Sequence, residues 1–208
     1  MDQNEENKNT FGNAWTDAGR LVERQVKTEQ VFDGVLLDAN RDRVSLPDGS
    51  DSVREWIRHP GACTVLPVFE NGDIMLVKQF RYPMGQIFLE VPAGKIDAGE
   101  PEEVTAVREL EEETGLVCRH VEYLGHIYPC IGYSDEIIHF YMAWDIEQVK
   151  SNTDSDEFLE PVRLPYSEAI EMVHRGEITD AKTVTHLLRG LRWMEKRHTE
   201  RKLSQSES

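Results

Sequence analysis

GKIDAGEPEEVTAVRELEEETGL, residues 94–116, is the stretch that decides the fold and the chemistry expected of this chain. Between Glu109 and Glu113, four of the five residues are glutamates, and Arg108 directly precedes them. Like charges at i,i+4 on one helix repel by about 0.2–0.5 kcal/mol per pair. A sequence shaped only by stability would avoid this crowding. We therefore expect a partner that offsets the repulsion, and a divalent cation is the first candidate.

The stretch is predicted to form a loop, Gly94–Gly99, followed by a helix. Pro101 suits the first turn of a helix, because its missing N–H has no intrahelical partner there. Gly115 is a typical C-terminal stop. The helix should therefore run from about Pro101 to Thr114. The apolar side chains expected to face a sheet are Val104, Val107 and Leu110.

The glutamates of this helix fall on one face. Glu109, Glu112 and Glu113 are spaced i, i+3 and i+4, and carboxylate oxygens are the ligands that hard divalent cations such as Mg²⁺ and Mn²⁺ prefer. Arg108 lies outside this trio and can orient Glu100 or Glu112 through a charge-assisted hydrogen bond. The alternative is a solvated acidic helix face, the usual role of a charge run.

The whole stretch resembles the Nudix box of the Nudix hydrolases, G-x5-E-x7-R-E-U-x-E-E-x-G-U with U aliphatic. It fits at every fixed position: Gly94, Glu100, Arg108, Glu109, Leu110, Glu112, Glu113, Gly115 and Leu116. Enzymes of that family hydrolyse a nucleoside diphosphate linked to another group, using Mg²⁺ or Mn²⁺ held by the glutamates of the box. So many specified positions at fixed spacing make a chance match improbable.

The resemblance implies a role for each matching residue. The implied metal ligands are the side chains of Glu109, Glu112 and Glu113 and the backbone carbonyl of Ala93. Glu112 would act in catalysis with Arg108 and Glu100, the two residues that orient the ligands. The metal would neutralise the diphosphate oxygens and lower the pKa of a bound water, so that the water attacks phosphorus.

The flanking sequence, from about Val31 to Trp193, looks like the ADP-ribose pyrophosphatase branch of the family. The segments that carry this likeness are Arg54–Trp56 (REW), His59–Gly61 (HPG), Val77–Gly85 (VKQFRYPMG) and Leu89–Glu100 (LEVPAGKIDAGE). Members of that branch are homodimers whose N-terminal sheet is exchanged with, or packed on, the partner subunit. The resemblance therefore implies a homodimer for this chain as well.

The same likeness suggests residues that bind substrate. Arg81, in the QFR motif, would contact phosphates or ribose. Arg54 and Trp56 would bind the nucleoside part across the dimer interface, since an aromatic face can stack on adenine and an arginine fork matches phosphate. Glu90 is expected to hydrogen-bond substrate or a partner arginine, and Glu136 to face substrate or metals. The simpler alternatives are an exposed edge-strand charge for Arg81 and an ordinary core residue for Trp56.

The general base of this branch comes from an acidic loop well after the box. Asp156-Glu157-Phe158-Leu159-Glu160 matches that loop, so Glu157 is predicted to be the base or an additional metal-linked carboxylate. Asp156 and Glu160 are close substitutes. The alternative is that Ser151–Glu160 is only a solvated loop, as polar loops usually are.

One segment departs from the branch. ADP-ribose enzymes usually carry Ser-Pro-Gly or a similar turn after the box, whereas this chain has Pro129-Cys130-Ile131-Gly132, with isoleucine in place of the marker proline. That loop shapes the pocket for the distal ribose. The departure weakens the assignment of the sugar and leaves the assignment of a hydrolase intact.

The composition of the chain limits its expected partners and its expected location. The formal net charge of −16 over 208 residues argues against nucleic acid or an anionic membrane as the main partner. The N-terminus lacks the apolar segment of a signal peptide, and no apolar run is long enough to span a membrane. The three cysteines are not in CxxC spacing, so neither disulfides nor zinc are expected. A cytoplasmic protein is the expectation.

The expected organisation has four parts: a frayed tail (1–18), an N-terminal antiparallel β subdomain for dimerisation (19–59), a Nudix hydrolase domain (60–200) and a flexible tail (201–208). The strands expected in the subdomain are Val31–Leu37, Val44–Leu46 and, after a turn at Asp48-Gly49, Val53–Arg58. Those of the main domain are Ala62–Phe69, Asp73–Phe80, Ile87–Val91, Val121–Tyr128 and Ile137–Trp144. Helices are expected from an N-cap at Ser167 to Arg175 and from about Ala181. The fold class is α/β (α+β), a Nudix fold with a mixed sheet between helices.

The resulting hypothesis is an Mg²⁺-dependent hydrolase that cuts ADP-ribose to AMP and ribose 5-phosphate. The alternative within the same class is a pyrophosphatase for GDP-mannose or another sugar nucleotide. An alternative of a different class is a non-catalytic Nudix regulator that binds ADP-ribose, since fold alone does not establish function. Such regulators usually have degraded boxes, whereas this box is complete.

Overall fold

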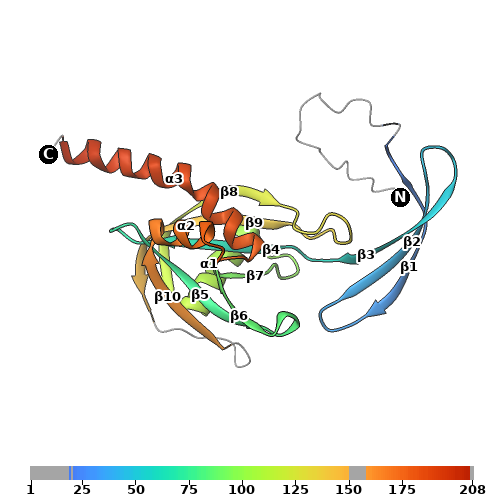
Figure 1. Ribbon diagram of the computed structural model, residues 1–208, viewed down its shortest axis with the longest axis horizontal. Coiled ribbons are helices and arrows are strands. Elements are labelled where there is room, and N and C mark those ends of the chain that lie inside the picture. The colour runs from blue at the N-terminus through green and yellow to red at the C-terminus, as the bar shows by residue number, and fades with distance from the viewer. Residues whose placement is uncertain (1–18, 20, 150–157, 207–208) are drawn as a thin grey trace. The chain divides into compact units, whose positions relative to one another are not determined.

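The computed structural model describes residues 19, 21–149 and 158–206, with side chains described up to residue 199. The chain divides into two compact units, Met1–Arg58 and His59–Ser208. Figure 1 labels the elements of both. Of the described helices, none is long and apolar enough to cross a membrane.

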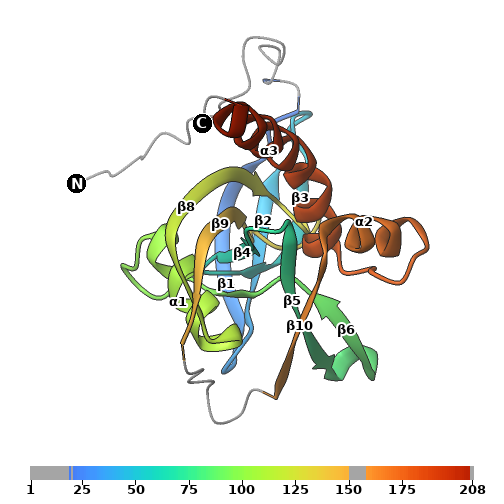
Figure 2. The same cartoon turned by 90° about the vertical axis from the view of Figure 1, so that its left-hand side faces the viewer.

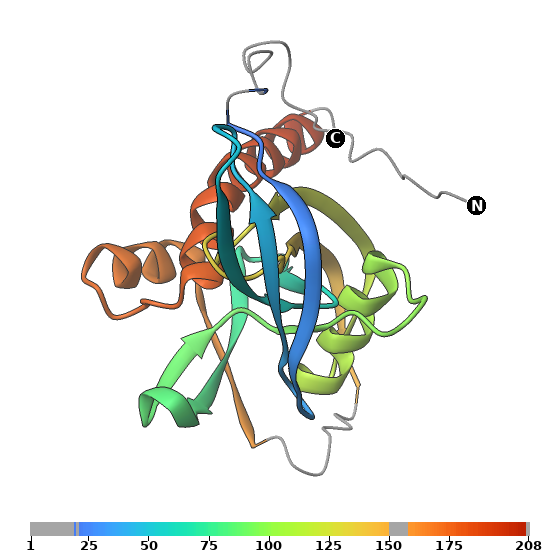
Figure 3. The same ribbon diagram turned by 90° about the vertical axis from the view of Figure 1, so that its right-hand side faces the viewer.

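The first unit contains a three-stranded antiparallel sheet, β1-β2-β3 (Figure 3). Its strands are β1 (Arg24–Asp33), β2 (Asp38–Ser45) and β3 (Asp51–Arg58). The expected turn at Asp48-Gly49 joins β2 to β3, with Gly49 at φ 86°. The strand expected over Val31–Leu37 was wrong in its bounds, because Gly34 donates its N–H to the carbonyl of Leu37 at 2.9 Å and turns the chain between β1 and β2.

Large apolar side chains of this unit remain exposed, while polar ones are buried. Phe32 is 56% and Val53 55% exposed, whereas Asp42 is buried and accepts a hydrogen bond from Gln25 at 2.8 Å. Hydrogen bonding, from Thr28 foremost, lowers the pKa of Asp42 against the opposing effect of burial. A sheet of this size with its apolar side chains outside has no sufficient core of its own.

The second unit is built on a seven-stranded sheet of order β10-β5-β4-β9-β8, in which β6 pairs with β5 and β7 with β4. β4 and β9 run parallel and the remaining pairs antiparallel, so the sheet is mixed. The strands are β4 (Ala62–Val68), β5 (Asp73–Arg81), β6 (Gln86–Glu90), β7 (Ala93–Lys95), β8 (Leu116–Ile127), β9 (Ile138–Gln148) and β10 (Leu159–Pro165). The helices are η2 (Tyr82–Met84), α1 (Glu102–Thr114), α2 (Tyr166–His174) and α3 (Ala181–Ser206).

Helices cover both faces of this sheet. Along β4, Val65 packs in the cluster that contains Leu110 of α1, and Leu66 packs in the cluster that contains Leu187 of α3. Successive side chains of a strand point to opposite faces, and β4 is apolar except for Thr64 because both of its faces are buried. Figure 2 shows α1 on one side of the strands and α2 and α3 on the other. The expected α/β class, with a mixed sheet between helices, is confirmed.

Several bounds and one helix face differ from expectation. Leu110 is buried as expected, but Val104 is 51% exposed, and the buried side of α1 also carries Thr105, Ala106, Glu109 and Glu113. β8 begins at Leu116, and short β7 occupies the start of the expected loop. The N-cap of α2 is Pro165 and not Ser167, and no side chain caps this helix end.

β10 was not expected at all. Its residues follow the acidic loop directly and include Pro161 and Pro165, which disfavour a strand assignment. The structure pairs β10 with β5 at the edge of the sheet. An edge strand tolerates proline, because only one of its sides needs ladder hydrogen bonds.

Candidate active site

The box stretch forms a strand, a loop and a helix, and the helix ends where the sequence predicts. α1 follows Pro101, whose φ is −66°, and Gly115 stands at φ 65° with its N–H donated to the carbonyl of Glu111 at 2.8 Å. β7 pairs antiparallel with β4, with Gly94 opposite Cys63. The two ends of the box are therefore both anchored to the sheet.

Two glutamates of the box are buried against β7. The Glu109 carboxylate occupies the space beside Gly94, where an added Cβ would lie 1.7 Å from its Oε1. Oε2 of Glu113 accepts the N–H of Ala93 at 3.1 Å. Glu109 is 8% and Glu113 4% exposed. Burial of carboxylates is costly unless a partner compensates the charge.

Arg108 is the first such partner in the structure. Its Nε and Nη2 lie 3.1 and 3.0 Å from the two carboxylate oxygens of Glu100, and its Nη1 lies 2.8 Å from oxygens of both Glu109 and Glu112. Nη2 also donates to the carbonyl of Lys95 at 3.3 Å. The arginine thus holds three carboxylates of the box at once.

Arg108 and Glu100 each stabilise the charged form of the other. The hydrogen bonds from Arg108 and from Thr105, which donates its hydroxyl to Glu100 at 2.7 Å, lower the pKa of Glu100 to about 2. The same pairing raises the pKa of Arg108 above its ordinary value. The role of Thr105 was not predicted from the sequence, although this residue lies one turn after the start of the helix, within reach of the loop.

The donor chemistry fits a hard divalent cation. The side chains of Glu109, Glu112 and Glu113 come from one helix face, and the backbone of Ala93 lies against Glu113. Within the described part of the chain, however, no three histidine, cysteine, aspartate or glutamate side chains already have the arrangement of a metal site. Glu109 and Glu112 instead share the guanidinium of Arg108, each through one carboxylate oxygen.

Arg81 and Glu90 form a two-point ion pair on neighbouring strands. Nε and Nη2 of Arg81 lie 2.8 and 2.7 Å from the two oxygens of Glu90. The Glu90 side chain is 2% exposed and that of Arg81 42%. Burial acts to raise the pKa of Glu90, but the bonds from Arg81 and the charge of Lys182 outweigh it and hold that pKa below its usual range.

Lys182 and Asp180 were not singled out from the sequence. Lys182 forms an ion pair with Glu90 and lies 2.9 Å from Asp180. The available signal was an aspartate directly before a predicted helix, which indicates an N-cap. No signal connected this helix start to Glu90, 92 residues earlier.

Glu136 lies in the loop after β8. Its backbone N–H meets the Ser134 hydroxyl at 3.2 Å, and its carboxylate is 3.9 Å from Nδ1 of His59. A hollow of about 310 Å³ next to this loop is lined by His59, Gly61, Glu100, Glu102, Asp135 and His139. Because it contains Glu100, the hollow adjoins the box.

The remaining predicted residues make other contacts, within their own unit, or fall outside the described residues. Arg54 pairs with Glu23, and Trp56 has the guanidinium of Arg58 5.5 Å from its ring centre, all within the first unit. Glu157 and Asp156 fall outside the described residues. Glu160, at the start of β10, forms an exposed ion pair with Lys78 at 2.7 Å.

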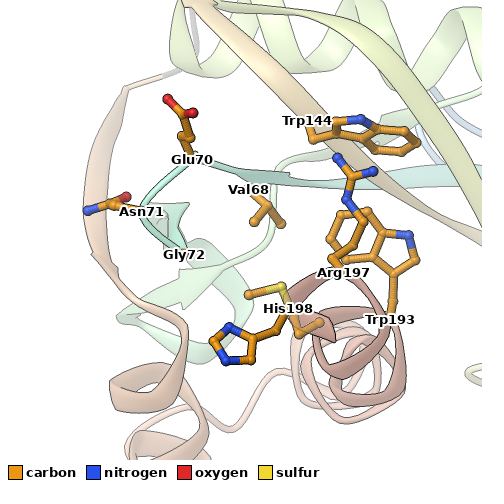
Figure 4. Close-up of a pocket in the computed structure, with 9 residues that line it drawn as sticks. Val68, Glu70, Asn71, Gly72, Trp144, Trp193, Arg197 and His198 are labelled. Atoms are coloured by element: carbon orange, nitrogen blue, oxygen red, sulfur yellow. The ribbon is translucent and has the colours of Figure 1, made fainter. Parts of the chain in front are cut away.

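A separate hollow of about 140 Å³ lies by the turn between β4 and β5 (Figure 4). Arg197 lies there with its guanidinium 4.4 Å from the ring centre of Trp144 and 5.3 Å from that of Trp193. Val68, at the C-terminal end of β4, lines it, whereas β7 pairs with the other end, Ala62–Thr64. This hollow therefore does not belong to the candidate active site.

Comparison with known proteins supports a relation to one family. The family model described as NUDIX domain matches residues 58–187. The chain is 41% identical over 165 residues to a protein named ADP-ribose pyrophosphatase from Bacillus subtilis, covering 78% of this chain and 89% of that protein. It is also 41% identical over 169 residues to a protein named methanol dehydrogenase activator from Bacillus methanolicus, covering 80% and 91%.

A more distant relative carries another substrate in its name. The chain is 36% identical over 152 residues to a GDP-mannose pyrophosphatase from Yersinia enterocolitica, covering 67% of this chain and 79% of that protein. A solved structure titled ADP compounds hydrolase superposes with a TM-score of 0.75, at 21% identity, over 84% of this chain and 95% of that one. This last match shows the fold alone.

Proposed function

This chain belongs to the Nudix family, and from that premise we propose that it hydrolyses the diphosphate bond of ADP-ribose to AMP and ribose 5-phosphate. The observation that carries the proposal is the complete box, whose Arg108 holds Glu100, Glu109 and Glu112 beside β7. A sequence that had lost catalysis would have no need of so crowded a set of carboxylates. A related nucleoside diphosphate sugar is the next substrate to consider.

The proposed cofactor is Mg²⁺, with Mn²⁺ as its substitute. Its ligands would be the side chains of Glu109, Glu112 and Glu113 and the backbone carbonyl of Ala93. When bound, the ion supplies neutralisation of diphosphate charge and a water of lowered pKa. Arg108 and Glu100 keep the glutamates in place, and such supporting residues typically matter about 10–100-fold for metal affinity or activity.

The other roles are proposals that follow from position. Arg81, exposed at the end of β5, would bind the phosphates or ribose. Arg54 and Trp56 would bind the nucleoside from a partner subunit, and Glu136 would face the substrate from the loop after β8. Glu157 would be the general base, with Asp156 and Glu160 as the substitutes.

We also propose a homodimer formed through the first unit. The support is its exposed apolar surface, which includes Phe32 and Val53 at 56% and 55% exposure. Large apolar side chains that a single copy leaves exposed can be covered by a partner subunit. The acidic charge of the chain disfavours nucleic acid and membrane surfaces as partners, and a cytoplasmic location accords with its three free cysteines.

The decisive experiment is incubation of the pure protein with ADP-ribose or GDP-mannose, with and without Mg²⁺, followed by quantification of AMP or GMP. AMP from ADP-ribose at the higher kcat/KM is the expected result. GMP at the higher kcat/KM would favour the second candidate, which rests on Ile131, 83% exposed where the branch has a proline, and on the GDP-mannose relative.

A Glu112→Gln chain separates catalysis from binding. Its turnover should fall by at least about 100-fold, because a metal ligand is lost, while ADP-ribose still binds. The matched control is Glu111→Gln, which changes a glutamate of the same helix outside the proposed ligand set. If the unmutated chain binds ADP-ribose without hydrolysing it, the chain is a regulator and the proposed activity is wrong.

A further inference from the structure

Two cations, Arg81 and Lys182, pair with one buried carboxylate of the second unit. Glu90, at the end of β6, is 2% exposed. Its Oε2 accepts hydrogen bonds from Nη2 of Arg81, at 2.7 Å, and from Nζ of Lys182. Its Oε1 accepts from Nε of Arg81 at 2.8 Å. One negative charge is therefore shared between two positive ones.

Lys182 reaches this position because the first turn of α3 is tightly capped. The carbonyl of Asp180 accepts the N–H of Val184 at 2.9 Å, the first bond of the helix. Oδ2 of Asp180 accepts the N–H of Thr183 at 3.0 Å and its hydroxyl at 2.6 Å. This is the geometry of an N-cap aspartate. The same oxygen lies 2.9 Å from Nζ of Lys182.

The capped turn also holds the strand that leads into the box. The Thr183 hydroxyl accepts the N–H of Val91 at 2.9 Å, and both residues are buried. Val91 is followed by Pro92 and by β7, whose Ala93 and Gly94 contact the glutamates of α1. The helix start at Asp180–Thr183 is thus linked to Glu90 and Val91, which lie three and two residues before β7.

The charge of Lys182 changes how far Arg81 is needed to neutralise Glu90. If Glu90 had only Arg81 as a cation, the guanidinium would have to neutralise a carboxylate buried at 2% exposure, and breaking such a buried pair is strongly unfavourable. Lys182 is itself 14% exposed and supplies a second charge. The guanidinium, 42% exposed, then keeps its direction through two bonds to Glu90 and retains charge for an anion outside.

We propose that Lys182 is a positioning residue that acts through Glu90 to hold Arg81 in place for the diphosphate of the substrate. This inference rests on the proposed function for the identity of that substrate. Glu90 is then a residue that orients Arg81 and not one that touches the sugar nucleotide.

The test is a double-mutant cycle between Lys182→Met and Arg81→Met. Each is placed in the Glu112→Gln background, and the Kd for ADP-ribose is measured by calorimetry. Lys182→Met should raise Kd by about tenfold, the loss expected when one charge-assisted hydrogen bond fails. The double variant should bind no more weakly than Arg81→Met alone, because both changes remove the same interaction.

Two further variants give the controls. Lys182→Arg keeps the charge and should recover most of the affinity that Lys182→Met loses. Lys196→Met removes an exposed lysine from the same helix and should leave Kd unchanged. Unfolding temperatures are recorded for every variant, since a residue that only stabilises α3 would lower Tm without changing Kd.

An unchanged Kd in Lys182→Met, or additive effects in the double variant, would overturn the inference. The proposed function is tested separately, in the chain with Glu112 intact. There, turnover of ADP-ribose should show a raised KM in Lys182→Met with a smaller change in kcat. Binding of ADP-ribose without any turnover in that chain would contradict the proposed function alone.

Discussion

The carboxylate of Glu109 lies where a side chain on Gly94 would have to be, with its Oε1 1.7 Å from the position of an added Cβ. The first glycine of the box is therefore needed for space, since its own φ is not in the left-handed region. Its partner, 15 positions later in the sequence, is one of the proposed metal ligands. The relationship links the start of the box directly to its chemistry.

Gly94→Ala should impair metal-dependent activity more than stability. The new methyl group would displace the Glu109 carboxylate, which is the end of a flexible side chain, so the backbone need not move. We expect activity to fall about 10–100-fold, the usual cost of disturbing a metal ligand's support, with a higher Mg²⁺ requirement. Activity is titrated against Mg²⁺ in parallel with thermal unfolding.

The control for Gly94→Ala is Gly132→Ala, where nothing lies within 4 Å of the added Cβ, and its Tm should be unchanged. An unaltered Mg²⁺ dependence in Gly94→Ala would contradict the prediction.

Arg108→Lys should also lower activity by about 10–100-fold, although the charge is kept. One guanidinium contacts Glu100, Glu109 and Glu112 at 2.8–3.1 Å, and an ammonium cannot reproduce that fork. The measurement is kcat/KM at saturating Mg²⁺. Arg119→Lys is the matched control, since Arg119 makes an exposed pair with Glu147 and such pairs contribute little. Equal activity of both variants would exclude the proposed role of Arg108.

Stability should fall in acid partly through His186. This side chain is fully buried, with Nδ1 3.0 Å from the Thr64 hydroxyl and its ring stacked on Phe140 at 4.9 Å. Burial lowers the pKa of His186 to about 3, whereas the pKa of an unfolded histidine is about 6.5. The unfolded chain therefore binds the proton first.

The direction of the pH dependence of stability follows because the unfolded chain binds the proton at a higher pH than the folded chain. Between pH 6.5 and about 3 the unfolded state holds more protons, so the contribution of His186 to stability is complete above about pH 6.5 and declines as the pH falls, by about 1.4 kcal/mol per unit. His186→Asn cannot take up this proton, and its free energy of unfolding should depend less steeply on pH in that window. Denaturant unfolding from pH 7 to pH 4.5 measures both slopes. Identical slopes would refute the assignment.

Phe32→Glu should dissociate the proposed dimer. Phe32 is 56% exposed on β1, and a charge placed in an apolar interface is strongly unfavourable. Light scattering after size exclusion should give twice the chain mass of 23.9 kDa for the parent and a single chain for the variant. Lys27→Glu, an exposed change on the same strand, should leave the mass unchanged. A parent of 23.9 kDa at micromolar concentration would remove the basis of the proposal.

The local sequence correctly predicted those features that depend on neighbouring residues, namely helix ends and tight turns. The bounds of α1 follow from Pro101 and Gly115, and the β2–β3 turn from Asp48-Gly49, because helix caps and tight turns depend on neighbouring residues. The same reasoning was wrong at Val104, which the 3.6-residue period places near the sheet but which is half exposed. It also overlooked β10, whose prolines are tolerated only because tertiary pairing places that strand at an edge.

The sequence by itself determined that three glutamates share a helix face, because helical periodicity converts spacing into position. It also placed an arginine and an outlying glutamate at the spacing of the Nudix box. Only the tertiary structure decided which groups those charges meet. Glu109 lies against Gly94, one guanidinium binds three carboxylates, and Glu90 meets Lys182 across 92 residues. Contacts between distant segments depend on how strands and helices pack, and no local pattern contains that information.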